Sequence, residues 1–208
     1  MEWPIFDGLP AADVQKVLEA ARRRTFAKGE IVFHRGDPGD SLHLVVKGRF
    51  AIRVMTPVGD VATLGIRGPG QSFGEMALVH PESHRAATVQ ALEPAETQAL
   101  AYSQLGQLRP AVDRLLVVLL ADDLRRQNEL LLDAFYVPAE RRVLRRLLEL
   151  GSPVVLTQEE LAQLAGTSRA TVNRVLRDEE KRGTVELARG RVTVVDPDAI
   201  RRRARVTT

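Results

Sequence analysis

The spacing of apolar residues changes along the chain, and each change predicts a different kind of element. Residues 5–24 place apolar side chains on one face at helical spacing, which predicts a short amphipathic helix. This face consists of Val14, Val17, Leu18 and Ala21. From about residue 25 to residue 105, short runs that alternate apolar and polar residues are separated by glycine-containing turns. Such closely spaced strands are typical of an antiparallel barrel or jelly roll.

A third pattern, over residues 109–136, predicts a long helix with two apolar stripes. One stripe alternates spacings of three and four, as the seam of a coiled coil does. This seam consists of Val117, Leu120, Leu124, Gln127, Leu131 and Ala134. The other stripe, with Leu115, Leu116 and Leu119, is expected to pack on the strand domain, while the seam packs on a second copy of the chain. The alternative is an ordinary buried helix, but a polar Gln127 favours the homodimer because it can set the register of two helices.

The Val137-Pro138 dipeptide ends this helix and predicts a domain boundary. Pro138 suits the first position of a further helix, which Gly151 ends. The apolar positions of that helix are Val143, Leu144, Leu147, Leu148 and Leu150. The expected domains are a strand domain over 1–108, a dimerisation helix and hinge over 109–137, and a C-terminal domain over 138–208.

Capping signals in the C-terminal domain predict two short helices joined by a tight turn. Thr157 and Glu160 form a capping box for the first helix, Gly166 permits the turn, and Ser168 caps the second helix. The two helices are expected over 158–165 and 169–181. This arrangement is the signature of a helix-turn-helix. A hairpin around Arg189-Gly190 would add a wing, and Asp196-Pro197 would open a last short helix.

The second of these helices has a face suited to DNA. By the helical period, Arg169, Ala170, Asn173, Arg174 and Arg177 share its outer face. Arginine is the best reader of guanine, and short hydroxyl side chains suit phosphates. The full set of candidate DNA-contacting residues is Thr157, Gln158, Ser168, Arg169, Ala170, Thr171, Asn173, Arg174, Arg177, Arg189 and Arg191. The alternative is a winged helix that binds another protein.

The charge distribution agrees with a polyanion partner for the C-terminal domain. The chain has a net charge of +3, but residues 1–137 contain 15 basic and 17 acidic side chains, whereas residues 138–208 contain 15 basic and 10 acidic ones. The absence of cysteine excludes disulfides, cysteine-ligated zinc and iron–sulfur clusters. No apolar run of membrane-spanning length and no signal peptide is present, so we expect a cytoplasmic protein without membrane contact.

Residues 73–89, FGEMALVHPESHRAATV, contain the remaining candidate chemistry. Gly74 and Glu75 begin the stretch, and Arg85 follows ten positions after Glu75. A buried phosphodiester needs a paired cation and oriented donors, and a carboxylate can select a ribose hydroxyl.

Four features follow one another along the chain: KGEIVFHRGDPGDSLHLVVKG, FGEMAL with RAATV, the long helix, and LTQEELAQLAGTSRATVNRVL. In these features and their order, the sequence resembles the cyclic AMP receptor protein (Crp/Fnr) family of bacterial transcription regulators. The resemblance covers essentially the whole chain. It implies an α+β fold with an N-terminal double-stranded β-roll (a jelly roll of the cyclic-nucleotide-binding kind), a long dimerisation helix and a C-terminal winged helix-turn-helix.

By this resemblance, Gly74 permits close approach of the backbone, Glu75 accepts the ribose 2′-hydroxyl, and Arg85 binds the cyclic phosphate with help from the N–H groups of Ala86 and Ala87. The implied effector is cyclic AMP (cAMP). The implied ligand-binding set is Gly74, Glu75, Met76, Ala77, Arg85, Ala86, Ala87, Gln127 and Asn128. RNA polymerase is a further implied partner, together with a twofold-symmetric double-stranded DNA site.

Four positions depart from the family pattern. Ala86 stands where many bacterial members have serine or threonine. Because relatives that bind cyclic GMP tend to have threonine there, Ala86 favours cAMP over cyclic GMP. Gln127-Asn128 align with the Thr-Ser pair that meets adenine, and these amides can pair with adenine or fill the pocket. Ala170 replaces a glutamate that accepts from cytosine, so we expect relaxed or changed preference at that base pair.

The expected function is therefore a homodimeric DNA-binding regulator, by family an activator, controlled by cAMP. The alternatives are the same regulator without cAMP control, and a cyclic-nucleotide module that regulates a partner protein. A metal enzyme of the cupin kind is disfavoured because the four histidines, His34, His43, His80 and His84, form no His-x-His motif. We expect no metal, and a haem ligand at His80 or His84 is disfavoured by their polar loop.

Overall fold

The computed structural model describes residues 3, 6, 10–57, 59–79, 84–105, 111–154 and 156–205. At Val79, Ala111, Arg114 and Leu115 it describes the backbone and not the side chain. The contacts divide the chain into two compact units, residues 1–125 and 126–208, and each is described by itself. None of the helices in these residues is long and apolar enough to span a membrane.

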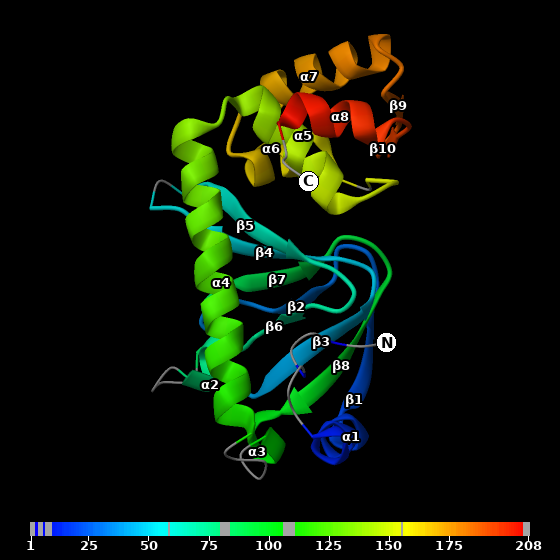
Figure 1. The fold of residues 1–208 in the computed structure, drawn as a ribbon. Coiled ribbons are helices and arrows are strands. Elements are labelled where there is room, and N and C mark those ends of the chain that lie inside the picture. Colours follow the sequence, from blue (N-terminus) through cyan, green and yellow to red (C-terminus); the bar gives the residue numbers. More distant parts are fainter. Residues whose placement is uncertain are drawn as a thin grey trace. The chain divides into compact units, whose positions relative to one another are not determined.

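The first unit is a β-roll of two four-stranded antiparallel sheets (Figure 1). One sheet has the order β1-β8-β3-β6 and the other the order β2-β7-β4-β5. The strands are β1 (Arg22–Phe26), β2 (Ile31–Phe33), β3 (Ser41–Lys47), β4 (Phe50–Met55), β5 (Val61–Arg67), β6 (Ser72–Phe73), β7 (Thr88–Ala91) and β8 (Ala95–Ala101). The β-roll expected from the sequence is therefore confirmed.

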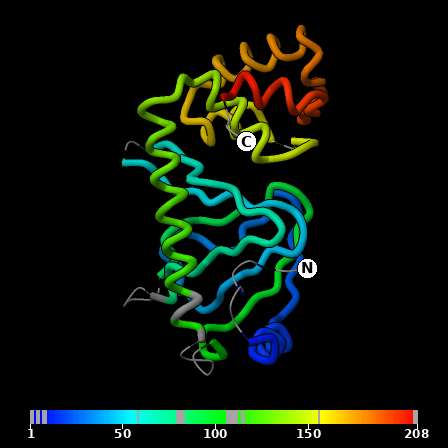
Figure 2. The backbone as a smooth tube through the Cα atoms, in the orientation of Figure 1, coloured from blue at the N-terminus to red at the C-terminus, as the bar shows by residue number. Residues whose placement is uncertain are grey.

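The N-terminal helix is shorter than its sequence pattern predicts. Helix α1 (Ala11–Ala20) buries Val17. Residues 22–24, which the sequence pattern predicts to be helical, are not part of a helix. They belong to β1, which pairs along its whole length with β8, far away in the sequence (Figure 2). Phe26 at the end of β1 is buried between the sheets, so tertiary pairing and burial override the helical spacing of the preceding residues.

Two apolar clusters fill the first unit. The cluster between the sheets consists of Phe26, Val45, Phe50, Phe73, Val89, Ala91 and Ala95. The other cluster joins α1, β3, β8, the short helix α3 (Tyr102–Leu105) and the first turns of α4 (Ala111–Tyr136). Leu116 is buried there and Leu119 packs against it, which confirms this part of the second apolar stripe; the side chain of Leu115 lies outside the described residues.

The predicted seam of α4 is exposed in the single chain. Val117, Leu124 and Leu131 are 67%, 63% and 54% exposed. Three further apolar side chains near the end of the helix, Leu132, Phe135 and Tyr136, are also exposed. An exposed apolar stripe of this extent is typical of a surface that docks on another surface.

The second unit contains a helix-turn-helix followed by a two-stranded wing. Its elements are the end of α4, α5 (Ala139–Leu150), α6 (Gln158–Ala165), α7 (Arg169–Lys181), β9 (Val185–Ala188), β10 (Arg191–Val194) and α8 (Pro197–Ala204). The predicted bounds of the two helices of the motif are confirmed. One detail differs: Pro138 is the residue before α5 and not its first helical residue, because its ψ of 141° is extended.

Candidate functional site

A glycine brings the start of the candidate ligand cassette, residues 74–87, against its arginine. Gly74 follows β6 with a φ of 100°, a region that favours glycine. A Cβ atom at this position would lie 2.8 Å from Nη1 of Arg85 and 2.9 Å from the carbonyl oxygen of Ser41. Since the carbonyl belongs to the backbone, it could not move aside cheaply. The next residues, Met76–Val79, form the one-turn helix α2.

The guanidinium of Arg85 is buried at the centre of the cassette. The residue is 4% exposed, and its Nη1 donates to the carbonyl oxygen of Ser41 (2.7 Å) and to the Tyr102 hydroxyl (3.2 Å). The same plane lies 4.0 Å from the ring centre of Phe33. Its Nε is buried without a hydrogen-bond partner among the described residues. A buried cation of this kind requires an anion close by.

The anion that meets Arg85 in this structure is the carboxylate of Asp40. Nη2 of Arg85 donates to Oδ1 of Asp40 and to Oγ of Ser41, both at 3.1 Å. The Asp40 side chain is 86% exposed, whereas that of Arg85 is 3% exposed. A hydrogen bond from the Ser41 hydroxyl, followed by the charge of Arg85, lowers the pKa of Asp40. The cassette thus contains a buried cation whose carboxylate partner can leave toward solvent.

Glu75 is also buried, but it faces α4. It is 7% exposed and lies near enough to Asp123 of α4 to feel the charge of that carboxylate, and Asp123 forms a 2.8 Å ion pair with Arg67 of β5. Burial is the main cause that raises the pKa of Glu75 to about 7, and the charge of Asp123 adds to it. In this structure the candidate ribose acceptor is therefore a buried carboxyl group with another acid close by.

The other candidate ligand residues differ in exposure. Met76 and Ala86 are exposed, Ala87 is half-buried and Ala77 is buried. Gln127 and Asn128 are exposed residues of α4 that belong to the second unit, so their part in the ligand site stays a prediction. The structure thus brings Gly74 against Arg85, while the ligand-binding roles of these residues and of Glu75 stay predictions.

Five residues of this site were not predicted: Asp40, Ser41, Arg67, Tyr102 and Asp123. Asp40 ends the turn after β2 and Ser41 begins β3, and the polar GDPGDS sequence there was a signal that could have indicated them. The other three come from β5, α3 and α4, and no local pattern distinguishes them from surface residues.

His43 is a structural histidine and not a candidate ligand of haem. Its ring is 1% exposed, stacks on Phe73 with ring centres 4.9 Å apart, and shares a hydrogen bond with the Thr97 hydroxyl. Burial, with a smaller effect of the Arg85 charge, lowers its pKa to about 3. His84 is exposed, and His80 lies outside the described residues. Among the described residues, no group of His, Asp and Glu side chains could hold a metal ion.

The candidate DNA face of the second unit is built on two capped helices. The hydroxyl oxygen of Thr157 accepts a hydrogen bond from the backbone N–H of Glu160, and the Glu160 carboxylate accepts one from the backbone N–H of Thr157. The predicted capping box is therefore present. Oγ of Ser168 accepts from the N–H of Thr171. The predicted outer face is exposed in every member, namely Arg169, Ala170, Asn173, Arg174 and Arg177. Arg189 and Arg191 of the wing are exposed too.

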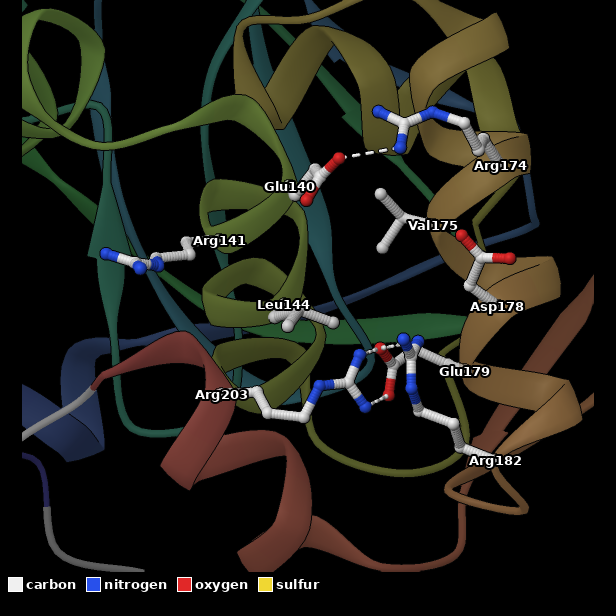
Figure 3. Close-up of a pocket in the computed structure, with 9 residues that line it drawn as sticks. All are labelled: Glu140, Arg141, Leu144, Arg174, Val175, Asp178, Glu179, Arg182 and Arg203. Atoms are coloured by element: carbon white, nitrogen blue, oxygen red, sulfur yellow. Dashed lines mark hydrogen bonds and ion pairs between the residues drawn. The ribbon is translucent and has the colours of Figure 1, made fainter.

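Behind this face lies a pocket of about 250 Å³ between α5, α7 and α8 (Figure 3). Arg174 forms a 2.6 Å ion pair with Glu140 at its rim, and both side chains are more than half exposed. Deeper in, Glu179 is 1% exposed and meets the guanidinium groups of Arg203 and Arg182 (Figure 3). The Thr184 hydroxyl also donates to Glu179, at 2.6 Å.

Replacing Glu179 by alanine is expected to lower the free energy of unfolding by about 2 kcal/mol, because the buried Thr184 hydroxyl and the half-buried Arg203 guanidinium would lose their charged acceptor. Glu180→Ala is the matched control. Its ion pair with Arg177 is exposed, so we expect a change below about 1 kcal/mol. Urea unfolding monitored by circular dichroism measures both. Equal values for the two variants would contradict a structural role of Glu179.

Three arginines of α5 attach the end of α4 to the helix-turn-helix. Arg142 donates to the carbonyl oxygen of Val137 (2.7 Å), just after α4, and to that of Gly166 (2.7 Å), in the turn between α6 and α7. Asp133 of α4 pairs with Arg145 at 2.5 Å and with Arg146 at 3.0 Å. The last turns of α4 therefore belong to the same compact unit as the recognition helix.

Comparisons with known proteins identify both parts of the chain. Residues 23–110 match the family model of the cyclic nucleotide-binding domain, and residues 141–203 match that of the Crp-like helix-turn-helix domain. The first match covers most of the β-roll and the cassette. The second covers α6, α7 and the wing.

Curated relatives match along nearly the whole chain. A CRP-like cAMP-activated global transcriptional regulator of Mycobacterium tuberculosis is 33% identical over 97% of this chain and 96% of its own length. The cyclic AMP receptor protein of Thermus thermophilus is 38% identical over 92% of each chain. The crystal structure of the Thermus thermophilus catabolite activator protein aligns with a TM-score of 0.55 at 36% identity, over 97% of this chain and 98% of that one.

Proposed function

The chain belongs to the cyclic AMP receptor protein (Crp/Fnr) family, a family of transcription regulators and not of enzymes, and on this premise we propose that it is a homodimeric, sequence-specific DNA-binding regulator controlled by cAMP in the β-roll. The observation on which the ligand proposal rests is the guanidinium of Arg85, which is buried while its carboxylate partner Asp40 is exposed. The relatives named above as cAMP-activated or as a cyclic AMP receptor support cAMP as the effector.

The ligand would bind by exchange of partners at Arg85. A cyclic phosphate offers a guanidinium fork two non-bridging oxygens, which share one negative charge, so it can accept two hydrogen bonds where Asp40 now accepts one through a single oxygen. Asp40 is free to turn into solvent, because its side chain is 86% exposed. The N–H groups of Ala86 and Ala87 would bind the same phosphate. Ala86 adds no hydroxyl, which is consistent with cAMP and not cyclic GMP.

The DNA would bind at the N-terminal half of α7. Arg169 and Arg174 would meet guanine edges in the major groove, while the capping hydroxyls of Thr157 and Ser168 and the wing arginines would meet phosphates. The Arg174–Glu140 pair is exposed, so its loss on DNA binding costs little. At the base pair facing Ala170 we expect relaxed or changed preference.

The dimer would form along the seam of α4, whose apolar residues Val117, Leu124 and Leu131 are exposed in the single chain. Two copies place two recognition helices on one face, and the matching DNA site is twofold symmetric. Ligand binding in the β-roll would shift the population of two dimer arrangements, of which one has its recognition helices a DNA turn apart. Activation through RNA polymerase is proposed from the family alone.

Fluorescence anisotropy with a labelled duplex, selected from a random library, tests this function. We expect saturating cAMP to raise the affinity for the selected duplex at least about tenfold, and cyclic GMP to have little effect. The affinity should fall steeply with salt. If cAMP has no effect while DNA binding persists, the regulator is independent of cAMP. Failure to prefer any duplex over random DNA in either condition would contradict the DNA proposal.

A further inference from the structure

One arginine of the recognition helix α7 is already paired with an acid from another helix. Nη1 of Arg174 donates to Oε1 of Glu140 at 2.6 Å, and this carboxylate belongs to the first turn of α5 (Figure 3). Arg169, the other proposed guanine reader, forms no ion pair with any residue that the structure describes. The two arginines therefore start from different states when DNA approaches.

The backbone on both sides of this ion pair is fixed. Leu144 of α5 and Val175 of α7 are buried and line the pocket beside the pair (Figure 3). Arg142, two positions after Glu140, donates at 2.7 Å to the carbonyl oxygen of Gly166, in the turn that leads to α7. All of these residues belong to the second unit. The acid therefore stays within reach of its arginine whatever the sequence of the bound DNA.

The pair can nevertheless open at small cost. The side chains of Arg174 and Glu140 are 57% and 56% exposed, and an exposed ion pair of this kind changes an equilibrium by only about two- to fivefold. A guanine offers O6 and N7 together to a guanidinium fork, which is a stronger attraction. A base that lacks this acceptor pair offers less than the carboxylate does. Guanine therefore takes the guanidinium from Glu140, and another base leaves it there.

We propose that Glu140 is a specificity-determining residue that acts through Arg174, as the alternative partner of this arginine when the facing base is not guanine. The protein then loses less affinity on such a site, because the guanidinium returns to a carboxylate and does not remain unpaired. Glu140 also lowers the affinity for the guanine-containing site, since the pair must open there. The inference rests on the proposed contact between Arg174 and guanine.

The effect is confined to one base pair of each half-site. Its measure is the penalty, which is the ratio of the dissociation constants for a duplex with guanine replaced and for the selected duplex. Glu140 reduces the penalty at the guanine that Arg174 reads. At the guanine that Arg169 reads the full penalty applies, because this arginine has no acid to return to. The chain thus contains its own reference position.

Fluorescence anisotropy of the full chain tests the inference, with or without cAMP, whichever gives the tighter binding. The two guanines are identified first, as the positions whose replacement no longer matters in Arg174→Gln and in Arg169→Gln. In Glu140→Gln we expect the affinity for the selected duplex to rise by about two- to fivefold for each half-site. The penalty at the Arg174 guanine should rise by the same factor, and the penalty at the Arg169 guanine should not change.

Asp198→Asn is the matched control for the loss of one negative charge. Asp198 is an exposed acid of α8 in the same unit, and its partner Arg201 is not among the candidate DNA-contacting residues. This variant should leave both penalties at their wild-type values, since any general gain in attraction to DNA cancels in the ratio. Combining Glu140→Gln with Arg174→Gln should give the penalties of Arg174→Gln alone.

An unchanged penalty at the Arg174 guanine in Glu140→Gln would refute the inference and leave the DNA proposal intact. A smaller penalty would refute it too, and would show that Glu140 orients Arg174 toward the base. If Arg174→Gln retains every preference of wild type, the guanine contact of Arg174 is wrong and the inference falls with it. If wild type prefers no duplex over random DNA, the DNA proposal itself is wrong.

Discussion

Replacing Arg85 by glutamine is expected to weaken cAMP binding about a hundredfold or more. The guanidinium is 4% exposed and would be the only charged side chain of the proposed cassette set facing the cyclic phosphate. Loss of one partner of a buried, hydrogen-bonded charge pair costs several kcal/mol of binding free energy. Glutamine keeps two donors and much of the volume, so the loss reports the charge and the fork. Calorimetric titration with cAMP measures it directly.

The control for this variant is Arg49→Gln. Arg49 belongs to the same unit, is partly buried, forms a 3.2 Å ion pair with Glu93, and is not a member of the proposed ligand-binding set. We expect its affinity for cAMP to remain within about twofold of wild type. Circular dichroism of Arg85→Gln establishes that the β-roll is still folded. A folded Arg85→Gln protein that binds cAMP within about tenfold of wild type would falsify the assignment of the phosphate site.

The second large effect is expected from lysine at two seam positions of α4. In the variant Leu124→Lys with Leu131→Lys, two side chains that are 63% and 54% exposed in the single chain become charged. Because the seam would bury them against a second copy, we expect a monomer at micromolar concentration. Binding through one half-site loses the gain from two linked contacts, so affinity for the symmetric duplex should fall by about a hundredfold or more. Analytical ultracentrifugation and anisotropy measure the two effects.

Asp122→Lys is the matched control for the seam. It introduces a lysine on the same helix but outside the seam. The Asp122 side chain is already exposed, where it forms an ion pair with Arg125. The oligomeric state and the affinity for DNA should both remain those of wild type. If the double variant stays dimeric while the control does too, another surface forms the dimer.

Much of the second unit could be predicted because its signals are local. Capping depends on residues three positions apart, so the sequence around Thr157 and Ser168 is enough to set the starts of α6 and α7. The exposed face of α7 follows from its period alone. Such elements need no knowledge of the rest of the chain.

The first unit was predictable as a class of fold but not in its contacts. Residues 22–24 continue the helical spacing of α1, yet they pair with β8, more than 70 positions later. Asp40 and Asp123 meet the cassette from the turn after β2 and from α4, and no spacing in the sequence connects them to Arg85 or Glu75. Contacts that depend on long-range packing of strands and helices are decided by the whole fold.

The attachment of α4 to the helix-turn-helix determines where the protein can be divided. A DNA-binding fragment that begins at Pro138 would lose Asp133, and with it the carboxylate that pairs with Arg145 and the buried Arg146. It would also leave Arg142 without the Val137 carbonyl oxygen. A fragment that begins at Arg126 keeps all of these partners. The self-sufficient C-terminal piece is therefore longer than the helix-turn-helix, and a chimera with another sensor should be joined within α4, ahead of Asp133.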